Sequence, residues 1–204
     1  DIISNTNGCG VVALDITGFF DNLNHVILKK AWAWILDEKD LPPDHYNIFK
    51  SLTKFSVVRK DDLYERFSIS RHNPKNGRVR ICSPIEFRNI VRRENLIKTN
   101  NEGKGIPQGT PISALLSNIY MTEFDRRVKE TVGEQGGVYL RYCDDMLLIV
   151  PAEYTESAAG YIREEIKNIG LDINPKKTEI RKFTLHRNVL RSDKPLQYLG
   201  FMFD

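Results

Sequence analysis

Three aspartates stand at the ends of apolar segments that are expected to be strands. Asp15 follows the run G-V-V-A-L of residues 10–14, and Asp144 and Asp145 lie between the apolar runs 139–142 and 146–150. Neighbouring carboxylates repel one another, and Asp is seldom buried without a compensating cation. The pattern therefore predicts a site at which carboxylate oxygens hold a cation.

The types of side chain favour a hard divalent ion. Carboxylates with no neighbouring His or Cys suit Mg²⁺ or Mn²⁺ rather than Zn²⁺, and the four histidines show no ligand-like pairing. Two such ions, about 4 Å apart, would activate an attacking hydroxyl and stabilise a leaving oxygen in phosphoryl transfer. The alternative is a hairpin turn whose aspartates simply face water.

The elements that must position these aspartates follow from hydrophobic periodicity and turn residues. Asp21 is the expected N-cap of the first helix, Asn76-Gly77 the turn of a hairpin, and Ser83-Pro84-Ile85-Glu86 a capping box. The first strand is expected at 10–16. The expected helices span 21–36, 42–55, 111–132 and 155–169, and the other expected strands span 67–70, 78–82, 139–142, 146–150, 171–173, 178–182 and 197–203.

The order of these elements indicates an α+β fold. Apart from an α/β insertion at about 37–104, the order is β, α, β, β, α, β, which is the split βαβ (ferredoxin-like) arrangement of an antiparallel sheet with helices on one face. In such a sheet the first strand lies beside the hairpin. Asp15 would then meet Asp144 and Asp145 across 129 positions of sequence.

Composition narrows the class of protein. The chain of 204 residues is 41% hydrophobic and 28% charged, as expected of one globular domain. Its three cysteines form no C-x-x-C pair, which favours the reduced cytoplasm. No run approaches the roughly 18 apolar residues of a membrane span, so we expect no membrane partner.

Positive charge is concentrated in the insertion. The net charge is +3, yet residues 59–98 hold eleven Lys and Arg against five Asp and Glu. A basic block beside an acidic remainder favours a polyanionic partner near a metal site. The alternative is a solvated charged surface.

Five motifs, in order along the chain, resemble the palm of a reverse transcriptase of the bacterial kind found in group II introns, retrons and phage-defence systems. They are V-A-L-D-I-T-G-F-F-D-N-L-N-H, G-I-P-Q-G-T-P-I-S-A-L-L-S-N-I-Y-M, R-Y-C-D-D, G-L-D-I-N-P-K-K-T and Q-Y-L-G-F. The resemblance implies an RNA-directed DNA polymerase, a nucleotidyltransferase that adds dNTPs to a DNA primer on an RNA template and uses two Mg²⁺ ions, with Mn²⁺ as a substitute.

The resemblance also implies roles for individual residues. Asp15, Asp144, Asp145 and the carbonyl of Ile16 would hold the metals, and Lys177, or its neighbour Lys176, would protonate the leaving pyrophosphate. The other implied groups are the nucleotide-binding residues Phe20, Gln108 and Gly109, the primer grip Tyr198, Leu199, Gly200 and Phe201, and, in the basic block, the nucleic-acid-binding Arg78, Arg80, Arg88, Arg92 and Arg93. Phe20 would lie beneath the incoming sugar.

The chain departs from the family pattern at Cys143, Thr110 and Ala114, where Ala, Ser and Pro are commoner, but at no metal ligand. We expect residues 1–204 to be a palm with its insertion, completed by fingers and thumb from the rest of the polypeptide or from another chain. The rival functions are a nucleotidyl cyclase, an RNA-dependent RNA polymerase and a non-catalytic RNA-binding scaffold.

Overall fold

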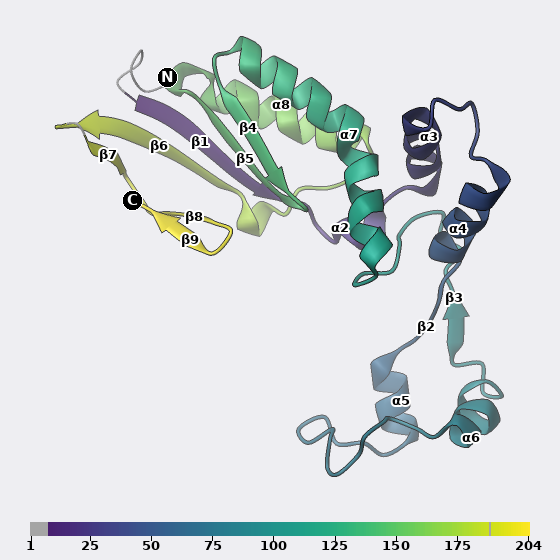
Figure 1. Ribbon diagram of the computed structural model, residues 1–204. Coiled ribbons are helices and arrows are strands. Elements are labelled where there is room, and N and C mark those ends of the chain that lie inside the picture. The colour runs from purple at the N-terminus through teal and green to yellow at the C-terminus, as the bar shows by residue number, and fades with distance from the viewer. Residues whose placement is uncertain (1–7, 188) are drawn as a thin grey trace.

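A five-stranded antiparallel sheet forms the centre of the molecule (Figure 1). The computed structural model describes residues 8–187 and 189–204. The order of the strands is β4-β5-β1-β6-β7. The strands are β1 (Gly8–Asp15), β4 (Val138–Tyr142), β5 (Asp145–Pro151), β6 (Glu179–His186) and β7 (Val189–Ser192). The expected α+β class with an antiparallel sheet is confirmed.

Two helices cover one face of this sheet, α7 (Pro111–Glu134) and α8 (Thr155–Asn168). The alternation of side chains along β1 explains why: Val12 and Leu14 point into the larger core beneath the helices, whereas Val11 and Ala13 point to the opposite face. On that face a small hairpin of β8 (Leu196–Tyr198) and β9 (Phe201–Phe203) covers part of the sheet.

The register of the central strands brings the aspartates together. β1 pairs with β5 so that Asp15 lies directly opposite Asp145. The amide of Ile16 donates to the carbonyl of Asp144 at 3.2 Å. Asp15 shares its sheet face with Ala13, so its side chain lies on the face opposite α7 and α8.

The expected N-cap at Asp21 is wrong. The chain forms a short helix, α2 (Phe19–Asn22), breaks at Leu23, and starts α3 (His25–Ile35) from Asn24. Asn24 Oδ1 accepts hydrogen bonds from the second and third amides of α3, at 2.9 and 3.2 Å. Leu23 is completely buried in an extended conformation, and this burial interrupts the helical pattern.

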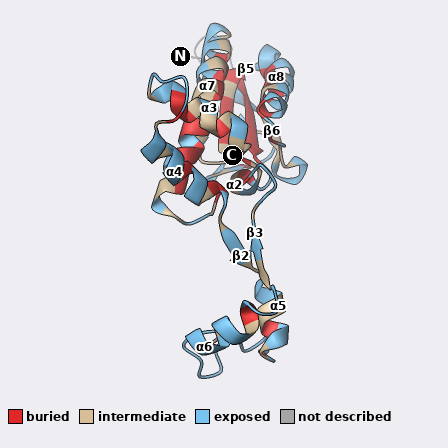
Figure 2. Cartoon of the chain, turned by 90° about the vertical axis from the view of Figure 1, so that its right-hand side faces the viewer, coloured by how far each residue is buried: buried red, intermediate tan, exposed pale blue. Residues whose placement is uncertain are grey.

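Part of the insertion projects from the body as an arm, defined as residues 56–99 (Figures 1 and 2). The helix α4 (Pro43–Thr53) that precedes it still contributes Phe49 to the main core. The arm begins and ends in a two-stranded ribbon. Its elements are β2 (Ser56–Val58), α5 (Lys60–Arg66), α6 (Pro84–Glu86), a π-helical turn (Phe87–Val91) and β3 (Ile97–Thr99).

The hairpin expected at 67–70 and 78–82 does not form. Asn76 and Gly77 do adopt positive φ angles of 20° and 74°, as a hairpin turn requires, but the flanking segments are bends and turns. Ile69 in the first segment is buried, but Val79 in the second is 97% exposed and Ile81 is 37% exposed, so the second segment presents no buried apolar face to a partner strand. A two-stranded hairpin without such a face is marginal in water. The capping box at Ser83 and Glu86 is confirmed, with hydrogen bonds of 3.2 and 2.7 Å.

Two more expected strands differ in the structure. The segment 171–173 contributes only an isolated bridge between Ile173 and Ile16. The segment 197–203 is not one strand but the β8–β9 hairpin, turned by Leu199 and Gly200 at φ 49° and 82°. β2, β3 and β7 were not expected.

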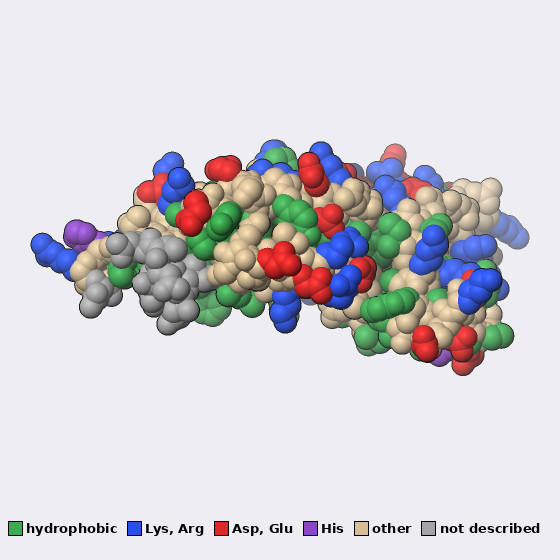
Figure 3. Space-filling view, turned by 90° about the horizontal axis from the view of Figure 1, so that it is seen from above, with side chains coloured by type: hydrophobic (Ala, Val, Ile, Leu, Met, Phe, Trp, Pro, Cys, Tyr) green, Lys and Arg blue, Asp and Glu red, His purple; other side chains and the backbone are tan. Residues whose placement is uncertain are grey.

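The face above α7 and α8 has mixed charge (Figure 3), with acidic and basic side chains interspersed and apolar side chains between them. Arg126 illustrates this mixture, because it pairs with both Glu123 and Glu130 on α7, at 2.7 and 2.9 Å. Within the described part of the chain, no helix is long and apolar enough to cross a membrane.

Candidate active site

Asp15 is the centre of the candidate site. It ends β1 with only 7% of its surface exposed, and both of its carboxylate oxygens accept hydrogen bonds. Lys177 Nζ donates to Oδ2 at 2.7 Å, and Asn174 Nδ2 donates to Oδ1 at 3.3 Å. The backbone amide of Asn174 also donates to the carbonyl of Asp15, at 2.8 Å. The segment that carries Lys177 is thus fastened to the end of β1.

Asp144 and Asp145 are presented by a tight turn between β4 and β5. Cys143 and Asp144 are the two loop residues, and only Cys143 has a positive φ, 59°. This is the pattern of a type II′ turn, in which glycine is usual at the first position. A non-glycine residue there costs of order 1–3 kcal/mol. The strain lies at the residue that precedes the two aspartates.

The electrostatics of the site reflect its crowded carboxylates. Burial raises the pKa of Asp145, and the charges of Asp144 and Asp15 raise it further, against the opposing effect of Lys177. The pKa of Lys177 is raised by its hydrogen bond to Asp15 and by the charge of Asp15, with smaller contributions from the other two aspartates. The site therefore carries excess negative charge that one ammonium group only partly neutralises.

The donor set fits a hard divalent cation in its chemistry. Asp15, Asp144 and Asp145 supply carboxylate oxygens, and the raised pKa of Asp145 shows that a further positive charge would be favourable. Among residues 8–187 and 189–204, however, no three His, Cys, Asp or Glu side chains already form a group that could hold an ion. In this structure Oδ2 of Asp15 accepts the hydrogen bond from Lys177 instead.

Two clefts meet at Asp15. One, of about 210 Å³, is lined by Asp15, Ile16, Phe20, Gln108 and Asp144 together with neighbouring residues. With Lys177, which also lines it, this cleft brings together six of the sequence-predicted site residues, from the end of β1, α2, the loop before α7, the β4–β5 turn and the segment before β6. Its size and its mixture of an aromatic ring, an amide and carboxylates suit part of a nucleotide. We call it the nucleotide cleft.

The other cleft, of about 380 Å³, lies between Asp15 and the β8–β9 hairpin. Asp145 and Lys177 line it on one side, and Tyr198, Leu199 and Gly200 line it on the other. Burial raises the pKa of the Tyr198 hydroxyl, and the charge of Asp145 adds to this effect. Three of the four residues that resemble a primer grip thus face the carboxylates, and we call this space the primer cleft.

The remaining predicted residues lie elsewhere. Gly109 is exposed with φ 86° beside Gln108, and Phe201 is 69% exposed on β9; neither lines either cleft. The nucleic-acid-binding candidates are all exposed on the arm, away from both clefts, and within the described residues none of them pairs with a carboxylate; they are Arg78, Arg80, Arg88, Arg92 and Arg93.

A network behind the β4–β5 turn was not anticipated. Arg141, whose side chain is only 8% exposed, makes a two-pronged bond to Asp125 of α7, at 2.8 and 2.6 Å, and donates to the carbonyl of Cys143 at 2.9 Å. Tyr139 donates to Asp125 at 2.7 Å. Burial, and then the charge of Asp125, raises the pKa of Tyr139. The only sequence signal was an arginine on an otherwise apolar strand.

Asn174 was likewise missed as a site residue, although it lies in the quoted motif G-L-D-I-N-P-K-K-T. Its Oδ1 accepts from the amide of Lys176 at 3.1 Å and so caps the turn Pro175–Lys177. The Lys176 side chain makes no hydrogen bond or ion pair with the described residues, whereas Lys177 binds Asp15.

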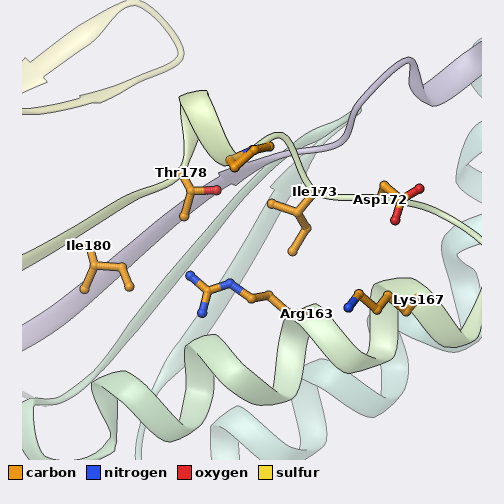
Figure 4. Close-up of a pocket in the computed structure, with 7 residues that line it drawn as sticks. Arg163, Lys167, Asp172, Ile173, Thr178 and Ile180 are labelled. Atoms are coloured by element: carbon orange, nitrogen blue, oxygen red, sulfur yellow. The ribbon is translucent and has the colours of Figure 1, made fainter.

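A separate cleft of about 540 Å³ lies between α8 and the segment 172–180 (Figure 4). Arg163 and Lys167 reach toward it from α8, and Ile173 and Ile180 form part of its apolar wall. It contains none of the three aspartates, so it is not the candidate active site.

Comparisons with known proteins agree with this geometry. The family "Reverse transcriptase (RNA-dependent DNA polymerase)" matches residues 2–203. The telomerase reverse transcriptase of Canis lupus familiaris is 34% identical over 161 residues, which cover 78% of this chain and 14% of that protein. The retron Ec86 reverse transcriptase of Escherichia coli is 35% identical over 74 residues, covering 36% of this chain and 23% of that protein.

Solved structures share the fold. Telomerase from Candida albicans, in complex with a fragment of telomeric RNA, superposes with a TM-score of 0.57 at 13% identity, over 98% of this chain and 31% of that one. Telomerase from Candida tropicalis without RNA gives a TM-score of 0.56 at 17% identity, over 96% and 31%. This chain spans less than a third of each of these proteins. With the family match extending over residues 2–203, the chain belongs to the reverse transcriptase family.

Proposed function

We propose that the chain is the palm of an RNA-directed DNA polymerase that adds dNTPs to the 3′-hydroxyl of a primer on an RNA template and releases pyrophosphate. The observation that carries this proposal is the position of Asp15 between the nucleotide cleft and the primer cleft. A carboxylate shared by both clefts can serve the attacking hydroxyl and the nucleotide at once. The order β4-β5-β1-β6, with α7 and α8 as the connecting helices, supports the split βαβ interpretation of this palm.

The cofactor in this proposal is a pair of Mg²⁺ ions, for which Mn²⁺ substitutes, held by Asp15, Asp144, Asp145 and the carbonyl of Ile16. When bound, the ions would lower the charge on the phosphate oxygens and favour the ionised primer hydroxyl. The protein's own task is positioning. The β1–β5 register fixes Asp15 opposite Asp145, and the strained turn at Cys143 fixes Asp144.

Other side chains have separate tasks. Lys177 would protonate the leaving pyrophosphate, since its ammonium group lines both clefts beside Asp15, at 2.7 Å from Oδ2. Phe20 lies under the sugar, Gln108 and Gly109 contact the base pair, and residues 198–201 hold the primer end. Of these, Phe20 and Gln108 line the nucleotide cleft.

The partners in this proposal are an RNA template, a DNA primer or product, dNTPs, and the fingers and thumb of a complete polymerase. The unpaired arginines of the arm contact phosphates. We further propose a bacterial, cytoplasmic protein of intron, retron or phage-defence type; the match to the Ec86 retron enzyme supports this lineage.

Primer extension by the natural full-length protein tests the proposal. RNA and DNA templates are each offered with dNTPs or rNTPs and Mg²⁺, and Asp144→Asn is the matched inactive control. We expect the wild type to add dNTPs on an RNA template. In the Asp144→Asn variant the rate of addition should fall by more than about 100-fold, the loss that follows removal of one electrostatic contact to a transition state. Activity retained in the variant contradicts the site.

The rival functions give different products in the same assay. Preference for rNTPs would indicate an RNA polymerase, and cyclic nucleotides formed without primer would indicate a cyclase. RNA binding without any synthesis would indicate a scaffold. Each of these results overturns the proposal.

A further inference from the structure

The side chain of Asn100 connects the root of the arm, defined as residues 53–56 and 99–100, to the segment that leads to the nucleotide cleft. Asn100 follows β3, and its backbone amide donates to the carbonyl of Phe55, on the other side of the ribbon, at 2.9 Å. Its side-chain Nδ2 donates to the carbonyl of Thr53 at 3.1 Å and to that of Lys104 at 2.8 Å. Its Oδ1 accepts from the amide of Glu102 at 3.2 Å. Asn100 thus links the last turn of α4 to the segment that follows the arm.

That segment, residues 104–108, is fastened in turn to the residues after β1. The amide of Gly105 donates to the carbonyl of Leu23, and the amide of Ile106 donates to the carbonyl of Phe20, both at 2.9 Å. Lys104 Nζ donates to Asn22 Oδ1, also at 2.9 Å. The contacts therefore run from Asn100 through Lys104 and Ile106 to Phe20.

At Gly105 the segment packs directly against the backbone of Asp21. Gly105 is buried with φ 84°, and a Cβ added there would lie 2.9 Å from the carbonyl oxygen of Asp21. His25 Nε2 donates to the carbonyl of Gly105 at 2.7 Å. Because the backbones touch here, a shift of the segment would be passed directly to Asp21 and to Phe20, both of which line the nucleotide cleft.

We propose that Asn100 is a positioning residue for the nucleotide cleft: it fastens the root of the arm to residues 104–108, and so holds Phe20 and Gln108 in place. The role in nucleotide binding rests on the proposed polymerase function. The mechanical link itself rests only on the hydrogen bonds and the packing of these residues, and it can be measured without any enzymatic activity.

Asn100→Asp is the sharpest test of this role. The substitution keeps Oδ1 for the amide of Glu102 but replaces the donor with an oxygen that faces the carbonyls of Thr53 and Lys104. Asn101→Asp is the matched control, since it makes the same change of charge at the neighbouring, exposed position. Asn100→Ala, which removes the donor without adding repulsion, is the second variant if Asn100→Asp does not fold.

The first measurement is amide hydrogen exchange at Gly105 and Ile106 in the natural full-length protein. We expect exchange to accelerate about tenfold in Asn100→Asp or Asn100→Ala, the factor that corresponds to a loss of about 1.4 kcal/mol on removal of one hydrogen bond. In Asn101→Asp we expect the wild-type rate. Equal exchange in the wild type and the Asn100 variants would overturn the inference, whatever the protein's activity.

The second measurement is steady-state primer extension. We expect the KM for the incoming dNTP to rise about tenfold in the Asn100 variants, while the Kd for primer-template without dNTP stays within about twofold. A rise in that Kd with an unchanged KM would make Asn100 part of the nucleic-acid surface and overturn the positioning role. If the wild type does not extend primers, the proposed function fails, and the exchange data still decide the link.

Discussion

At the scale of single residues, the raised pKa of Asp145 has a consequence for stability. The folded protein holds the carboxyl proton of Asp145 more tightly than the unfolded chain does. The contribution of Asp145 to the free energy of unfolding therefore falls as the pH rises from the unfolded pKa of this carboxyl group, about 3.9, through its raised folded pKa. We therefore expect Asp145→Asn to raise the Tm at pH 7.5, without divalent ions, and to change it little near pH 3. Thermal unfolding in chelator at both values of pH is the measurement.

The control for this experiment is Asp193→Asn, on an exposed residue. Mg²⁺ should also raise the Tm of the wild type more than that of Asp145→Asn, because an ion that binds only the folded state stabilises it by mass action. A Tm gain that is equal at both pH values would show that repulsion between the carboxylates is not its cause.

Phe20 is expected to govern sugar selection. Its ring lines the nucleotide cleft together with Asp15, from the same short segment of chain. A pocket that is merely apolar rejects an added hydroxyl by only about 10²-fold, so stronger selection requires a rigid group in the space of the 2′-oxygen. Phe20→Ala should lower the ratio of kcat/KM for dGTP to that for GTP by about tenfold or more. Phe124→Leu, a buried core phenylalanine on α7 that lines neither cleft, is the control. An unchanged ratio would assign Phe20 to the core alone.

At the scale of elements, the Asp125–Arg141 pair is expected to hold the β4–β5 turn in its strained shape. The planar guanidinium satisfies Asp125 and the carbonyl of Cys143 together, which a lysine of equal charge cannot do. Arg141→Lys should therefore lower kcat about tenfold while the KM for dNTP changes less. Arg126→Lys, on an exposed arginine of α7, is the control. Equal kinetics in the two variants would remove the positioning role.

The elements also show what the sequence was able to predict. β1, β4 and β5 were predicted because their runs are rich in apolar, aromatic and β-branched residues, and α7 and α8 because apolar residues recur at helical spacing; the pairing of β1 with β5 then places Asp15 beside Asp145. The residue roles carried over by resemblance remain predictions.

The predictions that were wrong or incomplete each have a local structural cause. Asp21 was predicted as the cap because Asp is a good cap residue, but the cap of α3 is Asn24, and the burial of Leu23 is what moves the start of the helix there. The hairpin expected at 67–82 has the right turn residues, but its second segment buries no apolar side chain, since Val79 and Ile81 are exposed. Arg141 and Asn174 were missed because their partners lie on other elements, Asp125 and Asp15, which periodicity along one element does not reveal.

At the scale of the whole molecule, the arm is expected to be the main electrostatic interface with nucleic acid. Replacing Arg88 and Arg92 by Gln should reduce the slope of log Kd against log salt by roughly 0.7–0.9 for each phosphate that is no longer neutralised. The control replaces Arg126 and Arg127 on α7, which already pair with glutamates. The measurement is the Kd for primer-template between 50 and 300 mM salt, roughly the range in which such slopes are resolved. Equal slopes in the wild type and the arm variant would make the arm a solvated surface.

The arm is also expected to open before the body. Tyr64, Ile69 and Val91 are its buried side chains in the described structure, whereas the body has a large continuous core. Local opening requires less free energy where few apolar side chains become exposed to water. Amides of α5 should therefore exchange faster than those of β5 in the free protein. Exchange at one common rate would mean that arm and body unfold as a single cooperative unit.

The hydrogen bond between Asn100 and Phe55 has a consequence for how the length of the arm can change during evolution. Phe55 and Asn100, which flank the 44 residues numbered 56–99, are joined backbone to backbone by a hydrogen bond of 2.9 Å. An inserted segment whose ends already touch can be lengthened, shortened or exchanged at small cost in closure entropy and without moving the host fold. The arm can therefore change in length and sequence while β1 and the aspartates keep their positions.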